Sequence, residues 1–93
     1  SYFITIDINY LSVMSGDLVT TIKRKIYGDV LASNNIGFSL RRWRQMFKIT
    51  QIELARYMGV SASVISEYEN DPNKSPGSRF LKRYIDSLVE IDM

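Results

Sequence analysis

The segment from Thr50 to Asn70 constrains the fold of this chain more than any other. Thr50-Gln51-Ile52-Glu53 has the form of a capping box, in which two side chains bond each other's backbone N–H groups at the start of a helix. Gly59 predicts the end of that helix, because glycine adopts the left-handed conformation without a Cβ penalty. Ser61 is a favourable N-cap for a further helix that runs to about Glu69. The segment therefore predicts two short helices around a tight turn.

Small and apolar residues fall at fixed places in this segment. Ala55 is small where two helices would cross closely, and Val60 and Ile65 fill the space between them. Nine residues are spaced as in the Cro and phage-repressor type of helix-turn-helix, also called the Xre family, which this segment resembles. They are Gln51, Leu54, Ala55, Gly59, Val60, Ser61, Ile65, Ser66 and Glu69. The resemblance covers Leu40 to about Leu88. It implies an all-α, lambda-repressor-like bundle of four to five helices with a central helix-turn-helix that binds double-stranded DNA.

The resemblance also implies roles for individual residues. The helix over residues 62–69 is expected in the major groove, with Ala62, Ser63, Ser66 and Glu67 facing the bases. Phosphate contacts are implied for Gln51, Ser61, Asn70, Lys74 and Ser78, and Lys74 is the strongest of these candidates. A partly buried ion pair between Arg44 and Glu69 is implied as a purely structural link.

The implied base-facing residues have short side chains. Ala62 can make only an apolar contact, such as one with a thymine methyl group, whereas Ser63 can donate or accept a hydrogen bond. Glu67 can accept from a cytosine amino group but is repelled by phosphates. We therefore expect modest direct readout, with DNA shape and flanking contacts supplying further discrimination.

Periodicity predicts the remaining helices. Residues 36–47 place Ile36, Leu40, Trp43 and Phe47 on one helical face, and residues 17–27 form an amphipathic helix with Ser15 as N-cap and Gly28 after its end. Ser33-Asn34-Asn35 predicts a loop. Ser75-Pro76 predicts the start of a last helix, whose wide apolar stripe consists of Phe80, Leu81, Tyr84, Ile85, Leu88 and Val89.

The N-terminal residues alternate in polarity, with Tyr2, Ile4, Ile6, Ile8 and Tyr10 on one face. This period of two predicts a strand-like extension over residues 1–13, paired with a second copy or with the short stretch 30–32. Since Met14-Ser15-Gly16-Asp17 resembles a natural start, residues 1–13 are either native or a leader or expression remnant. The expected organisation is then this extension, an N-terminal helix and loop over 14–35, and a DNA-binding domain over 36–93.

Two features leave alternatives open. The apolar stripe of the last helix is either covered by the helix at 17–27 or paired with a second molecule, which would make a homodimer through the C-terminal helix, the N-terminal segment or both. Trp43 and Tyr68 could stack on bases, but their positions beside core residues favour packing.

Charge is unevenly distributed. Residues 36–83 carry nine Lys or Arg against four Asp or Glu, whereas the last ten residues carry three acids and no base. A basic middle favours an anionic polymer as partner, although Arg41, Arg42, Lys48 and Arg56 are equally consistent with ordinary solvated charges.

Composition excludes several classes of protein. There is no histidine and no cysteine, so zinc fingers, disulfides and thiol nucleophiles are absent. No recognised motif places a pair of carboxylates or a lysine for catalysis. We therefore expect that the chain is not an enzyme and that it binds no cofactor and no metal. Apolar runs are far shorter than the roughly 20 residues that span a bilayer, so we expect a cytoplasmic protein without membrane segments.

The alternative function is a protein-interaction module, such as a coactivator or antitoxin, on the same fold. It is favoured by the acidic Glu67 and by the surplus apolar stripe. The stretch from Lys74 to Arg79 further resembles archaeal members of the family in which this domain is the N-terminal part of a longer regulator.

Overall fold

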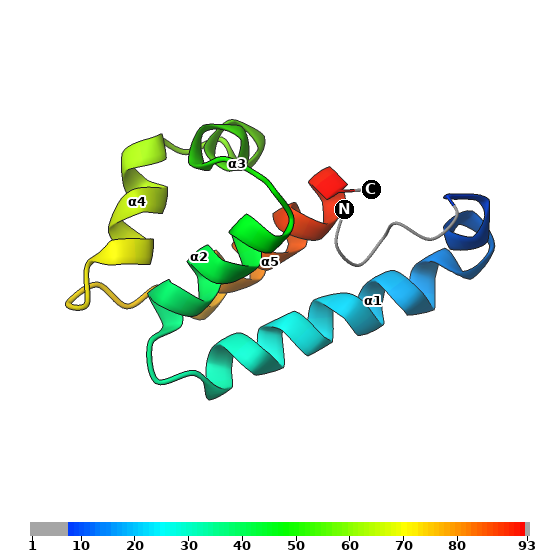
Figure 1. Ribbon diagram of the computed structural model, residues 1–93, viewed down its shortest axis with the longest axis horizontal. Helices are drawn as coiled ribbons and strands as arrows, with labels where there is room; N and C mark the ends of the chain where they lie inside the picture. The colour runs from blue at the N-terminus through cyan, green and yellow to red at the C-terminus, as the bar shows by residue number, and fades with distance from the viewer. Residues whose placement is uncertain (1–7, 93) are drawn as a thin grey trace.

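The computed structural model describes residues 8–92, with side chains from residue 17 onward. It contains five helices, α1 (Ile8–Ala32), α2 (Ile36–Met46), α3 (Gln51–Met58), α4 (Ala62–Asn70) and α5 (Ser78–Asp92), as shown in Figure 1. No strand occurs among these residues. The predicted all-α bundle is therefore confirmed.

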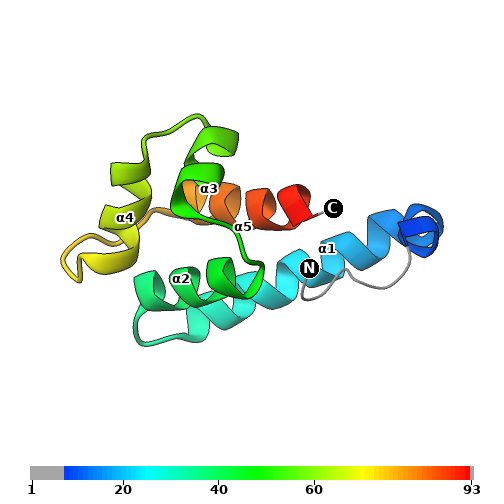
Figure 2. The same cartoon turned by 45° about the horizontal axis from the view of Figure 1, so that its top comes forward.

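The helices pack around α5. Figures 1 and 2 both show α5 between α1 on one side and α3 on the other, and α2 between α1 and α4. The α3–α4 pair forms the side of the bundle away from α1. This arrangement leaves the outward side of α4 free of the other helices.

The apolar stripe of α5 lies in the centre of the core. Leu81, Tyr84, Ile85, Leu88 and Val89 are all buried in the single chain. From α1, Ile26 and Val30 are fully buried in the same cluster. Except for the half-buried Phe80, the stripe is thus covered within one chain, as one of the two alternatives for it requires.

Acidic residues of α5 tie it to its two neighbours. Glu90 accepts from Lys23 Nζ of α1 at 3.2 Å and from the Tyr57 hydroxyl of α3 at 2.7 Å. The hydrogen bond from Tyr57, together with the hydrogen bond and the charge of Lys23, lowers the pKa of Glu90 below its usual value. Asp86 lies between Lys23 and Lys82. The acidic end of the chain is therefore part of a set of polar contacts between α1, α3 and α5.

The N-terminal predictions require correction. Residues 8–13 belong to α1 and are helical rather than strand, and residues 30–32 form its last turn, so they are not a strand partner. The helix also runs through Ser15 and Gly28 instead of being bounded by them. It continues past Gly28 because Val30 is fully buried one turn from Ile26, so that packing outweighs the low helix propensity of glycine. The rest of the predicted strand, residues 1–7, lies outside the described residues.

The start of α5 also differs from the prediction. The helix begins at Ser78, and its first turn is closed by the backbone bond from Leu81 N to Gly77 O at 3.0 Å. Ser75 is therefore not its N-cap. Pro76 lies before the helix and is buried, so it anchors the connecting loop.

Candidate nucleic-acid interface

The turn between α3 and α4 is built by local bonds that its sequence predicts. Thr50 Oγ1 accepts from Glu53 N at 3.0 Å, and the Glu53 carboxylate accepts from Thr50 N at 3.1 Å, so the capping box is confirmed. Gly59 has φ 73°, the left-handed conformation expected at the end of α3. Ser61 Oγ accepts from Val64 N at 3.2 Å and caps α4. These bonds fix where both helices begin and how they are joined.

The inner sides of α3 and α4 pack against each other and against the core. Leu54 and Ile65 are fully buried, and Ala55 is 3% exposed where the helices approach. Val60 N donates to Ala55 O at 3.0 Å across the turn. Because the inner side is fixed in this way, Ser63, Glu67 and Asn70 of α4 are directed outward.

The outward side of α4 carries the residues expected to face bases. Ser63, Glu67 and Asn70 are exposed and share one helical face through their spacing of four and three. Ala62 and Ser66 are half-buried at its edge. Asn70 Nδ2 donates to Ser66 O at 2.9 Å and to Ser66 Oγ at 3.2 Å. The face is therefore polar and narrow, and most of its side chains are short.

Two of the predicted DNA-contacting residues pair with each other. Lys74 Nζ forms an ion pair with Glu67 Oε2 and lies 5.9 Å from the centre of the Tyr68 ring. The hydrogen bond and charge of Glu67 raise the pKa of Lys74. Both side chains remain about half exposed, at 50% and 48%. Lys74 thus lies beside the outward face of α4 rather than apart from it.

Glu69 is the buried centre that joins four helices. Its carboxylate accepts from Arg44 Nε at 2.7 Å and Nη2 at 2.9 Å, which is a bidentate ion pair between α2 and α4. Gln51 Nε2 of α3 donates to Glu69 Oε1 at 3.1 Å, and the Tyr84 hydroxyl of α5 donates to Oε2 at 2.5 Å. The orientation of α4 is therefore held by one carboxylate whose side chain is 0% exposed.

These contacts set the protonation of the centre. Burial by itself would raise the pKa of Glu69, but hydrogen bonds from Arg44, Tyr84 and Gln51 and the Arg44 charge lower it below its usual value. Burial and the neighbouring Glu69 charge raise the pKa of the Tyr84 hydroxyl, so it stays protonated and donates. Arg44 also donates from Nη1 to Ile49 O at 2.8 Å. Every charge in the centre thus has a partner.

Tyr84 and Gly37 complete this arrangement, although sequence patterns do not identify them as part of it. Tyr84 is predicted only as one member of the α5 stripe; its signal is that it alone in the stripe carries a hydroxyl group. Gly37 lies where α2 meets the end of α4, and a Cβ atom there would lie 2.4 Å from Tyr68 O and 2.8 Å from Glu69 O. The close approach of these two helices therefore requires glycine.

The residues expected to contact phosphates occupy different environments. Ser61, Asn70, Lys74 and Ser78 are exposed, whereas Gln51 is half-buried and bonded to Glu69. Ser61 is already committed as the cap of α4. Gln51 and Ser61 lie at the N-termini of α3 and α4, where backbone N–H groups favour anions. The further cations Arg41, Arg42, Lys48 and Arg56 are exposed on α2, the loop and α3.

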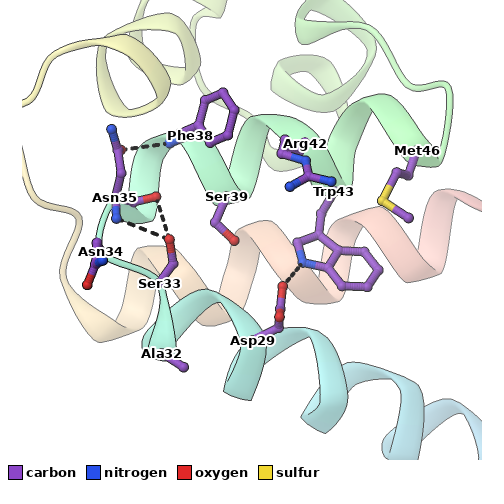
Figure 3. Close-up of a pocket in the computed structure, with 10 residues that line it drawn as sticks. All are labelled: Asp29, Ala32, Ser33, Asn34, Asn35, Phe38, Ser39, Arg42, Trp43 and Met46. Carbon is purple, nitrogen blue, oxygen red and sulfur yellow. Dashed lines mark hydrogen bonds between the residues drawn. The ribbon is translucent and has the colours of Figure 1, made fainter.

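The aromatic candidates are engaged in packing. Trp43 is 8% exposed, and its Nε1 donates to Asp29 Oδ2 at 2.8 Å, as drawn in Figure 3. It lines a pocket of about 610 Å³ between α1 and α2, and none of the lining residues belongs to α3 or α4. Tyr68 is half-buried with its ring centre 4.3 Å from that of Phe80. Packing is therefore favoured over base stacking for both residues.

Other kinds of site find little support in the part of the chain that the structure describes. Residues 8–92 contain no group of three or more acidic residues placed to hold a metal ion. Nor does any described helix combine the length and the hydropathy needed to cross a bilayer.

Comparison with known proteins agrees with the geometry of α3 and α4. Residues 40–88 match the family described as Helix-turn-helix. The chain belongs to this family. It is 49% identical over 67 residues to an uncharacterized HTH-type transcriptional regulator of Methanocaldococcus jannaschii, covering 72% of this chain and 28% of that protein.

A second relative, from Archaeoglobus fulgidus, has the same description and is 44% identical over 72 residues, which is 77% of this chain and 31% of that protein. The helix-turn-helix chain thus spans about a third or less of the length of the curated relatives it matches. No solved structure matches it significantly.

Proposed function

We propose that this chain is the DNA-binding part of a transcriptional regulator and that α4 enters the major groove of double-stranded DNA. The observation that carries the proposal is the outward polar face of α4, with Ser63 and Glu67 exposed in a helix-turn-helix whose inner side is fully packed. An α-helix fits the width of the major groove, where base edges present donors and acceptors to such side chains. The descriptions of the two archaeal relatives as transcriptional regulators support the same function.

Phosphate contacts supply most of the affinity in this proposal. Ser61 and Gln51 lie at helix N-termini, Asn70 is the exposed last residue of α4, and Ser78 is exposed at the start of α5. Base edges are then contacted by Ala62, Ser63, Ser66 and Glu67. Since these four side chains are short or acidic, base readout contributes a smaller share than the backbone contacts.

A homodimer would place two copies of α4 about 34 Å apart, so that they contact half-sites one turn of DNA apart. Because the α5 stripe is buried within one chain except for the half-buried Phe80, the pairing surface of such a dimer would lie mainly elsewhere than on that stripe. The N-terminal segment remains the other proposed pairing element.

A salt titration tests the proposal. Binding to a duplex of about 20 base pairs is measured by fluorescence anisotropy between 50 and 300 mM KCl, conditions chosen because each phosphate contact contributes about −0.9 to the slope of log K against log salt. The expected slope is clearly negative, near −3 to −6 for several phosphate contacts. A slope near zero, or no binding at the lowest salt, would contradict the proposal.

A protein-interaction module is the second candidate function. It is favoured by one observation: the outward face of α4 carries an acid, Glu67, and none of α4's own residues is Lys or Arg. Co-purification of a second, different protein, together with absent DNA binding at 50 mM salt, would favour this function over the first.

A further inference from the structure

Glu67 poses a problem for a helix that enters a DNA groove. Its carboxylate is exposed at the middle of the outward face of α4, one turn from Ser63. A free carboxylate there would be repelled by the phosphates that line both sides of the groove. The cost is removed only if a cation accompanies the acid into the groove.

Lys74 is placed to accompany it. The chain turns back after α4 through an Asx-type turn, in which Asn73 N donates to Asp71 Oδ1 at 2.9 Å and Lys74 N to Asp71 O at 3.1 Å. From this turn the lysine side chain passes over the Tyr68 ring, with Nζ 5.9 Å from the ring centre, and pairs with Glu67 Oε2. Backbone bonds, ring and carboxylate therefore all hold the lysine beside α4.

The pairing leaves one carboxylate oxygen available. Lys74 engages Oε2, and among the described residues no hydrogen bond to Oε1 is formed. In the major groove, base-edge donors are the amino groups of cytosine and adenine, and cytosine N4 is the usual partner of a glutamate. An oriented, charge-compensated carboxylate can accept from such a group without the phosphate repulsion.

We infer that Lys74 is a specificity-determining residue that acts on DNA through Glu67, orienting and neutralising the carboxylate so that it selects cytosine at one position of the half-site. This inference rests on the proposed function of α4. It differs from a phosphate contact by Lys74 in one respect: a phosphate contact strengthens binding to every sequence alike. A lysine that acts through Glu67 matters only where Glu67 is present and mainly for the preferred base.

The test is a double-mutant cycle with four proteins: the unmodified chain, Lys74→Met, Glu67→Gln and the variant with both changes. Methionine keeps an unbranched apolar stem over Tyr68 but carries no charge. Each protein is titrated by fluorescence anisotropy against four duplexes. One is a duplex that the unmodified chain binds, with cytosine at the position contacted by Glu67, and the other three carry each of the other bases at that position. Lys82→Met is the matched control, because Lys82 is also an exposed lysine paired with an acid, Asp86, but lies on α5. Thermal melting by circular dichroism checks that all variants fold.

We expect the unmodified chain to prefer cytosine by about 5- to 100-fold, which is the range for one base contact. The expected result is that Lys74→Met reduces this preference to near unity. In the Glu67→Gln background the same change alters affinity less than about 2-fold, and Lys82→Met alters neither property. The inference is overturned if Lys74→Met weakens all four duplexes by one factor in both backgrounds, since Lys74 is then a phosphate contact. If the unmodified chain binds no duplex, the proposed function itself fails, and the inference with it.

Discussion

Arg44 and Glu69 join α2 to α4 through two hydrogen bonds of 2.7 and 2.9 Å that are shut off from solvent. The two residues are 25 positions apart in the chain. Gln51 and Tyr84 reach the same carboxylate from α3 and α5. The helix proposed to contact DNA is therefore oriented by a polar centre inside the bundle. Substitutions in that centre are expected to lower the free energy of unfolding.

Replacing one member of the pair should be much more destabilising than replacing both. Glu69→Leu leaves the Arg44 guanidinium buried without its carboxylate, and it should reduce the free energy of unfolding by about 3–5 kcal/mol. Arg44→Met with Glu69→Leu removes both charges and should cost markedly less than Glu69→Leu alone. Urea unfolding followed by circular dichroism measures both. A loss in the double variant equal to the sum of the losses in Arg44→Met and Glu69→Leu would show that the pair is not coupled.

Stability should fall in acid partly because of Glu69. Its pKa is lowered in the folded chain relative to the ordinary value of 4.5, so the unfolded chain binds the proton more readily. The stabilisation from this group is complete above about pH 4.5 and is lost as the pH falls through the folded pKa. The free energy of unfolding between pH 6 and 3 should therefore decrease more steeply for the natural chain than for Glu69→Gln. Parallel curves would contradict the lowered pKa.

Gly37 and Gly28 should respond in opposite directions to the same substitution. Gly37→Ala places a methyl group 2.4 Å from Tyr68 O, so α2 and α4 must separate, and we expect a loss of about 1–3 kcal/mol. Gly28→Ala adds a methyl group with nothing within 4 Å, and it should gain up to about 1 kcal/mol from helix propensity. Urea midpoints of the two variants and the natural chain provide the comparison. A neutral Gly37→Ala would contradict the close approach.

The parts of the fold that local bonds determine could be predicted from the sequence. Thr50, Gly59 and Ser61 specify the bounds of α3 and α4, because a cap acts within one turn of its own position. The N-terminal region could not be predicted in this way. Its alternating isoleucines fit a strand locally, but residues 8–13 are helical, and α1 continues through Gly28 because of packing against distant helices.

The candidate site likewise has a part that local sequence predicts and a part that depends on the whole bundle. The exposed positions of Ser63 and Glu67 follow from helix periodicity once the inner residues of α4 are known. The partners of Gln51, Lys74 and Tyr84 do not, because each contact joins segments whose distance apart depends on the whole bundle. Resemblance to a family supplied the relation between Arg44 and Glu69, which spacing alone does not provide.

The most direct test of DNA recognition by α4 is selection of bound sequences from a random duplex pool at fixed salt, with the natural chain and with Ser63→Asn. Asparagine forms two hydrogen bonds with adenine, to the N6 amino group and to N7. The variant should therefore enrich adenine at one position of each half-site while leaving the other positions unchanged. Thr20→Asn, an exposed change on α1, serves as the control and should select the same motif as the natural chain. Recovery of one identical motif by all three proteins, or of no motif by any, would contradict base recognition by this helix.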